Sequence, residues 1–93
     1  MGLVFEWDSN KAKTNVLKHN VSFEEATTVF GDAHSITIES PNRSRHERRL
    51  DTMAMSASGR VIVVVHTERG RRIRIISARA ASRKERKQYL YEA

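Results

Sequence analysis

The feature that most constrains the fold is an uninterrupted apolar run, Val-Ile-Val-Val-Val, at residues 61–65. Consecutive β-branched residues favour a strand, and such a strand carries apolar side chains on both of its faces. It is therefore expected at the centre of a sheet that is covered on both sides. Turn signals at Ser58-Gly59 and Arg69-Gly70 flank the run. We predict a central strand over residues 60–67 that is joined to both neighbours by hairpins.

Alternation of polar and apolar residues predicts further strands around this run, over residues 34–39, 47–57 and 71–79. A short strand is also predicted at residues 3–7 from its Val, Phe and Trp. Because strands joined by short turns pair in sequence order, residues 34–79 should form an antiparallel meander of four strands. The polar stretch at residues 40–46 is predicted to be an exposed loop.

A first helix is predicted over residues 9–19, with Asp8 placed to cap its N-terminus. Ala12, Val16 and His19 recur at helical spacing, so we expect them to face the core. The neighbouring stripe of this helix consists of Lys11, Asn15 and Lys18.

Two more helices are marked by the spacing of a capping box. Ser22 and Glu25 open a helix that ends at Gly31, and Ser82 and Glu85 open a basic C-terminal helix. Helices segregated from an antiparallel meander predict an α+β fold. At 93 residues the chain is long enough for one domain, which we expect to span residues 1–93.

Composition excludes several classes of protein. The chain has no cysteine, which rules out disulfides, thiolate metal sites and a cysteine nucleophile. Its apolar runs are far shorter than the roughly 20 residues of a membrane span. The N-terminus has no basic stretch followed by an apolar one, so we expect no signal peptide and a cytoplasmic protein.

The charge balance favours a polyanionic partner. Seventeen Lys and Arg against 11 Asp and Glu give a formal net charge of +6. A nucleic acid satisfies such a charge, and so does an acidic protein.

The most concentrated basic residues lie near the end of the predicted meander. A strand places Arg72 and Arg74 on one face about 7 Å apart, which approximates the spacing of successive phosphates on a nucleic-acid strand. Arg69 lies beside them at the turn. Simple alternation puts Arg79 at the strand's end, on the same face as Ile73 and Ile75, where it could reach into a concave site. The alternative interpretation is a solvated face whose charges serve solubility.

Two histidines are candidate proton-transfer groups, because imidazole titrates near neutral pH. His19 lies on the apolar stripe of the first helix, where a buried, hydrogen-bonded histidine is the structural alternative. His66 ends the central strand, where it either lines a site or fills space.

Tyr89 lies among the basic residues of the last helix, where an aromatic ring can stack on a base. The alternative is that Tyr89 and Leu90 pack this helix onto the sheet. No metal-binding motif is present in the sequence, so we predict no metal site.

Several short motifs, in this order and at this spacing, resemble the BrnT toxins of bacterial type II toxin–antitoxin systems. Each is weak by itself, but together they extend over nearly the whole chain. They are Phe5-x-Trp7-Asp8, Lys11 with Asn15, Lys18-His19, Ser22-Phe23-Glu24-Glu25-Ala26, Arg74-x-Ile76-Ser77-Ala78-Arg79, and Glu85-Arg86-x-x-Tyr89.

The resemblance implies a RelE-like fold and a ribonuclease that arrests translation without a metal ion or other cofactor. In that chemistry a ribose 2′-hydroxyl attacks the adjacent phosphate while cations stabilise the pentacoordinate phosphorane. The family pattern assigns Arg79 to the phosphorane and Tyr89 to orienting or stacking the RNA. Proton transfer is left between His19, His66 and a lysine. The residues expected to bind the RNA are Lys11, Lys18, Arg69, Arg72 and Arg74.

The resemblance also implies a tightly bound antitoxin of the BrnA type, a ribbon-helix-helix protein. Operator DNA would be bound only through the toxin–antitoxin complex. Two other hypotheses use the same basic residues: a non-catalytic module that binds RNA or protein, and an inactive subunit that docks an acidic partner.

Overall fold

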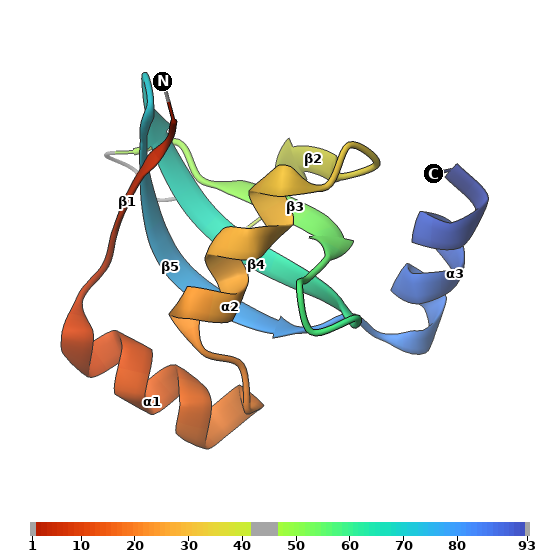
Figure 1. Cartoon of the computed structure of the whole chain (residues 1–93), viewed down its shortest axis with the longest axis horizontal. Coiled ribbons are helices and arrows are strands. Elements are labelled where there is room, and N and C mark those ends of the chain that lie inside the picture. The colour runs from red at the N-terminus through yellow and green to blue at the C-terminus, as the bar shows by residue number, and fades with distance from the viewer. Residues whose placement is uncertain (1, 42–46, 93) are drawn as a thin grey trace.

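The computed structural model describes residues 2–41 and 47–92, so most of the loop predicted at residues 40–46 lies outside the described residues. Figure 1 shows the order of elements along the chain. They are β1 (Val4–Glu6), α1 (Ser9–His19), α2 (Phe23–Thr27), the 3₁₀ helix η1 (Thr28–Gly31), β2 (Ile36–Glu39), β3 (Leu50–Met55), β4 (Val61–Arg69), β5 (Arg72–Ala80) and α3 (Arg83–Glu92). The predicted α+β class is confirmed.

The strands form one five-stranded sheet in the order β1-β5-β4-β3-β2. The strands β2 to β5 pair antiparallel in sequence order, which confirms the predicted meander. The sequence did not place β1, which joins the sheet parallel to β5 with Val4 opposite Arg72 and Glu6 opposite Arg74. None of the helices in the described part of the chain combines the length and apolar character that crossing a membrane requires.

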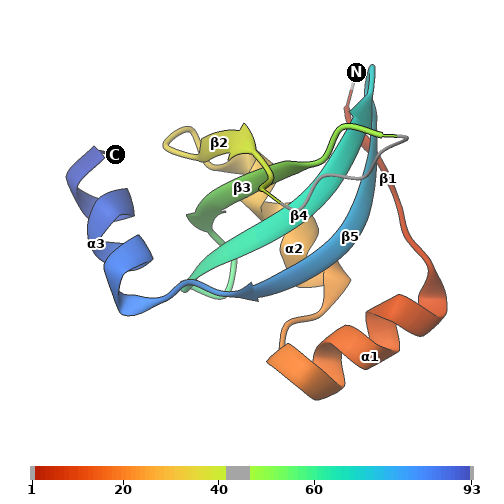
Figure 2. The same cartoon turned by 180° about the vertical axis from the view of Figure 1, so that it is seen from behind.

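Figures 1 and 2 show α1 and α2 on one side of the sheet and α3 beyond the end of β5. On the side of α2, Ile62 and Val64 of β4 belong to a core that also contains Phe23. On the side of α3, Val61 and Val63 belong to a second cluster with Tyr89. The prediction of a strand covered on both faces is therefore confirmed for residues 61–64, whereas Val65 is half-buried.

A β-bulge in β5 changes which face its second half presents. Val65 pairs with Ser77 but the next residue, His66, pairs with Ile75, so Ile76 is an extra residue in β5. Ile73 and Ile75 lie in the core on the α2 side, whereas Arg79 pairs with Val63, which packs on the α3 side. The predicted shared face of Arg79 with Ile73 and Ile75 is wrong, because the bulge inverts the alternation.

The buried side chain of α1 is not the one that helical spacing of apolar residues predicted. Val16 is 43% exposed and His19 is exposed, whereas Asn15 is only 5% exposed. The Asn15 amide donates to the carbonyls of Val21 and Ala78, both at 2.8 Å, and its oxygen accepts from the N–H of Ala78 at 3.1 Å. The helix therefore turns this amide, rather than Val16 and His19, toward the sheet.

The two predicted capping boxes differ in the structure. Ser82 and Glu85 form both reciprocal bonds at the start of α3. At α2, Ser22 accepts from the N–H of Glu25, but the Glu25 carboxylate turns instead to Arg60, whose Nη2 lies 2.7 Å from Oε1. This hydrogen-bonded pair, with Ser56 and Ser58, lowers the pKa of Glu25 to about 2 and joins α2 to the turn between β3 and β4.

Replacing Asn15 with Ala should lower the free energy of unfolding by about 2–4 kcal/mol, because each buried backbone group left unpaired costs about 1–3 kcal/mol. Urea unfolding followed by circular dichroism measures this loss. Thr14→Ala is the control, since Thr14 is an exposed neighbour whose hydroxyl bonds only within the helix. Equal stability of the two variants would contradict a structural role for the Asn15 amide.

Candidate nucleic-acid interface

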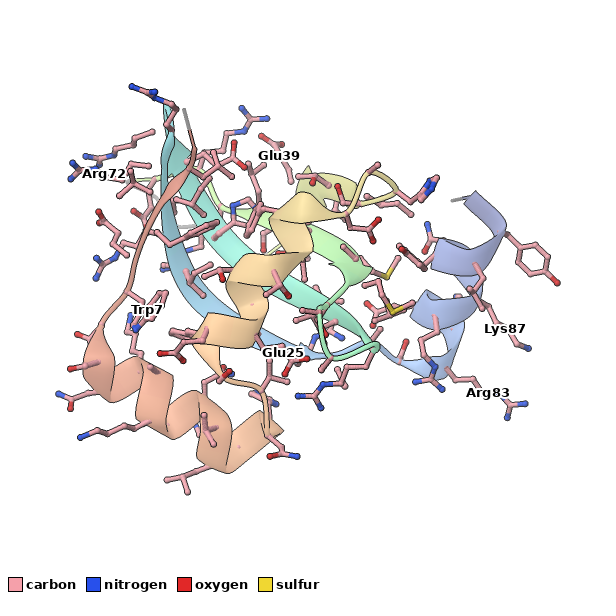
Figure 3. All side chains as sticks on the ribbon, in the orientation of Figure 1. Trp7, Glu25, Glu39, Arg72, Arg83 and Lys87 are labelled. Carbon is pink, nitrogen blue, oxygen red and sulfur yellow. The ribbon has the colours of Figure 1, made fainter. Side chains whose placement is uncertain are left out.

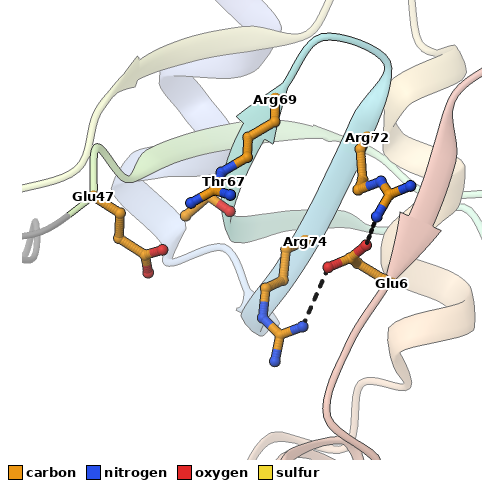
Figure 4. A pocket seen from close by; sticks show the side chains of 6 residues that line it. All are labelled: Glu6, Glu47, Thr67, Arg69, Arg72 and Arg74. Carbon is orange, nitrogen blue, oxygen red and sulfur yellow. Dashed lines mark hydrogen bonds and ion pairs between the residues drawn. The ribbon is translucent and has the colours of Figure 1, made fainter.

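Arginines from the β4–β5 hairpin surround an open pocket of about 360 Å³. Because Ile73 and Ile75 of β5 are buried in the core, Arg72 and Arg74 point to the opposite face of the sheet. Arg69, at the end of β4, lies on the same pocket. Its lining is completed by Glu6, Glu47 and Thr67 (Figure 4). The structure thus brings together the three arginines that the sequence predicted for RNA binding.

A carboxylate lies between two of these arginines (Figure 4). Glu6 Oε1 is 3.5 Å from Arg72 Nη1, and Glu6 Oε2 is 3.3 Å from Arg74 Nη1. Among the residues that the structure describes, no carboxylate lies within ion-pair distance of Arg69. With three arginines against the carboxylates of Glu6 and Glu47 in its lining, the pocket keeps a net positive charge.

A second groove, of about 300 Å³, runs between α1 and the edge of β5. Lys11, Lys18 and His19 all line it, beside the Ile76–Ser77 segment. The three residues lie together because Asn15, on the same stripe of α1, is bonded to the backbone of Ala78.

Asp8 lies near a cation of each site, Lys11 of the groove along α1 and Arg74 of the arginine pocket. The pKa of Asp8 is below its usual value, first because the backbone N–H of Lys11 donates to it, and also because the charges of Lys11 and Arg74 are near. Arg74 thus belongs to the pocket and lies close to the N-terminus of α1. We call this combined surface the basic groove, and its basic side chains are Lys11, Lys18, His19, Arg69, Arg72 and Arg74.

Arg79 lies outside the basic groove, toward the other end of β5. Its Nη1 and Nη2 donate to the two carboxylate oxygens of Glu85, at 2.7 and 3.0 Å. This bidentate pair holds the pKa of Glu85 at about 2 and raises that of Arg79. Because Glu85 also caps α3, the observed contact of Arg79 connects the end of β5 to the start of that helix.

Tyr89 is 5% exposed and packs in the cluster on the α3 side of the sheet. Its hydroxyl donates to the Asp32 carboxylate, which also accepts from the backbone N–H groups of Met55 and His34. The hydrogen bond raises the pKa of the Tyr89 hydroxyl. The packing alternative is therefore confirmed for Tyr89 and wrong for Leu90, which is 69% exposed.

His66 is fully buried, whereas His19 is exposed on the groove. The Nε2 atom of His66 lies 2.7 Å from Thr52 Oγ1, and Phe30 packs against the imidazole ring with its centroid 4.9 Å away. Glu68 Oε2 lies 3.4 Å from the other ring nitrogen. Burial lowers the pKa of His66 to about 4, so the ring is neutral near neutral pH and closed to a substrate.

Some residues of the two pockets were not predicted from the sequence. Glu6 and Thr67 reach the arginine pocket through strand pairing, and Glu47 enters it from before β3. A parallel pair between residues separated by more than 60 positions, such as Glu6 and Arg74, leaves no local signal. The described residues contain no group of three or more His, Asp or Glu side chains placed to hold a metal ion.

The sequence profile described as "Ribonuclease toxin, BrnT, of type II toxin-antitoxin system" matches residues 7–85 of the chain. The chain belongs to the BrnT family. BrnT proteins are thus identified as ribonuclease toxins of systems that pair a toxin with an antitoxin. The matched residues include every cationic member of the basic groove and end before Tyr89.

The fold is also that of a known BrnT protein. The crystal structure of the Brucella abortus ribonuclease toxin, BrnT, matches 89% of this chain and 99% of its own, with a TM-score of 0.65 and 22% identity. At this identity the likeness shows the shared fold. No curated protein sequence matches the chain. The BrnT resemblance seen in the motifs is confirmed by the family match.

We expect the buried His66 to make folding stability depend on pH. The pKa of His66 falls from about 6.5 in the unfolded chain to about 4 in the folded one. Its contribution to the free energy of unfolding is therefore complete above pH 6.5 and decreases as the pH falls toward 4. The loss should reach about 2–3 kcal/mol at pH 4.5. Urea unfolding of the wild type and His66→Gln at pH 7.5 and 4.5 measures it.

The glutamine amide can replace the bond to Thr52 but does not titrate, so His66→Gln should lose less stability between these two pH values than the wild type. His19→Gln, at an exposed histidine, is the control and should keep the pH dependence of the wild type. Parallel pH dependences for wild type and His66→Gln would contradict the burial of a neutral imidazole.

Proposed function

We propose that this BrnT-family ribonuclease binds and cleaves single-stranded RNA in the basic groove. One observation carries the assignment: cations from α1 and from the β4–β5 hairpin, far apart in the sequence, line two pockets beside β5, and Asp8 is near a cation of each. Arginine suits this surface, because its planar fork binds two oxygens of a phosphate at once. The basic net charge of the chain supports the same substrate.

The proposed reaction uses the RNA's own 2′-hydroxyl as the nucleophile and needs no metal ion. The 2′-oxygen forms a bond to the adjacent phosphorus, its proton passes to a general base, and the bond to the 5′-oxygen breaks as that oxygen gains a proton. Arg72 and Arg74 stabilise the negative charge of the phosphorane. We assign proton transfer to His19, because it is accessible in the groove while His66 is buried.

In this proposal Arg79 and Tyr89 have structural roles. The forked guanidinium of Arg79 is already occupied by Glu85, and the ring of Tyr89 is buried with its hydroxyl bonded to Asp32. Both contacts attach α3 to the sheet. A phosphate could occupy the same donors of Arg79 only after the pair with Glu85 opens.

We further propose that cleavage arrests translation in the cytoplasm and that a BrnA-like antitoxin neutralises it. Membership of a type II toxin–antitoxin family implies an antitoxin partner. The net charge of +6 favours acidic segments on that partner. A ribbon-helix-helix antitoxin would supply the contacts to operator DNA in the complex.

The direct test is cleavage of a defined single-stranded RNA by the purified chain in buffer containing EDTA. Arg74→Ala should lower the rate about 10²–10³-fold, as expected for loss of a group that stabilises developing charge. His19→Gln should lower it about 10²–10⁴-fold. Arg83→Ala removes the same charge from α3, at the opposite end of the molecule from Arg72, and should leave the rate unchanged (Figure 3).

The other outcomes separate the alternatives. RNA that is bound in a salt-sensitive manner but stays intact would support the non-catalytic binding module. If Arg79→Ala lowers the cleavage rate more than Arg74→Ala does, the phosphate is bound at the far end of β5 and not in the basic groove. Growth arrest on expression of the wild-type chain, relieved by coexpression of its antitoxin, tests the effect on translation in cells.

A further inference from the structure

Glu6 has a place in the basic groove that RNA binding by itself does not explain. A carboxylate repels phosphate, yet this one lies in the pocket between two of its arginines (Figure 4). Its position follows from the fold, because β1 pairs parallel with β5 and sets Glu6 opposite Arg74.

Each carboxylate oxygen of Glu6 contacts one arginine through a single terminal nitrogen. Oε1 contacts Nη1 of Arg72 at 3.5 Å, and Oε2 contacts Nη1 of Arg74 at 3.3 Å. A guanidinium has five N–H donors, so each fork keeps most of its donors for another ligand. One carboxylate thus joins two guanidiniums without saturating either.

The two arginines have few other restraints. Their side chains are 66% and 43% exposed, and a long exposed side chain loses up to about 2 kcal/mol of rotamer entropy when it is held in one conformation. Contact with Glu6 restricts both side chains before the RNA arrives. Positioning of this kind lowers a reaction barrier when the reacting geometry is strict.

We propose that Glu6 is a positioning residue of the nuclease, which holds the guanidiniums of Arg72 and Arg74 in place to bind one phosphodiester of the RNA. This inference rests on the proposed function of the basic groove. This role explains why a negative charge lies at a site that binds an anion. The Glu6 carboxylate weakens the attraction for RNA, but it fixes the geometry of the two arginines that stabilise the phosphorane.

The test is the steady-state kinetics of Glu6→Gln on the defined RNA. The substitution keeps the size of the side chain and removes its charge. Pure electrostatics predicts tighter RNA binding and an equal or faster reaction, since the pocket becomes more positive. Positioning predicts an equal or lower KM together with a kcat that falls by about 10–100-fold, because misplaced groups stabilise the phosphorane poorly. The two explanations therefore predict opposite changes in kcat.

Two further variants make the result specific. Glu39→Gln removes the carboxylate of another exposed ion pair, with Arg48 at 2.9 Å, and should leave kcat and KM unchanged. Glu6→Asp keeps the charge on a shorter side chain and should recover part of the lost kcat. Circular dichroism and urea unfolding establish that each variant folds like the wild type.

The outcomes distinguish this inference from the proposed function. A folded Glu6→Gln variant whose kcat equals or exceeds that of the wild type would overturn the role of Glu6, while the loss in Arg74→Ala would leave the basic groove as the site. If Arg72→Ala and Arg74→Ala both cleave RNA like the wild type, the proposed site fails and the role of Glu6 fails with it.

Discussion

The bonds between the Asn15 amide and the backbone of Ala78 determine where α1 lies, and the basic groove depends on that placement. The strand β1 pairs with β5 only along residues 72–74. Further along β5, the Asn15 amide takes the place of a neighbouring strand, because it bonds to both the carbonyl and the N–H of Ala78. Lys11 and Lys18 share the stripe of Asn15 along the helix, so fixing the amide directs both lysines along the edge of β5. A buried side chain thus positions exposed ones.

The two ends of β5 have different roles because of their surroundings. At the start, Arg72 and Arg74 share one carboxylate and face an open pocket. Toward the end, roughly 15 Å along the strand, Arg79 is clamped by Glu85 at the beginning of α3. The hydroxyl of Tyr89 and the carboxylate of Asp32 attach the same helix further along. These arginines look equivalent in the sequence, but they differ in how many of their N–H donors remain available to a ligand.

Much of the fold was predictable from local patterns. The apolar run at residues 61–65 led to the central strand, the turn signals led to the meander, and the Ser82–Glu85 box was correctly interpreted. The errors have physical causes. An extra residue at Ile76 reversed the face of Arg79, and a single polar side chain with three bonds, Asn15, displaced Val16 and His19 from the interior. Neither a bulge nor a satisfied buried amide is visible in hydrophobic periodicity.

The sequence by itself determined the fold class, the basic charge and the BrnT motifs, because these depend on residue types and spacings within short segments. The tertiary structure decided which of the candidate residues lie together on an accessible surface. It buried His66, exposed His19, engaged Arg79 and Tyr89 in attaching α3, and brought Glu6 between two arginines. The physical reason is that burial and ion pairing depend on contacts between distant segments, such as β1 with β5, which no local pattern specifies.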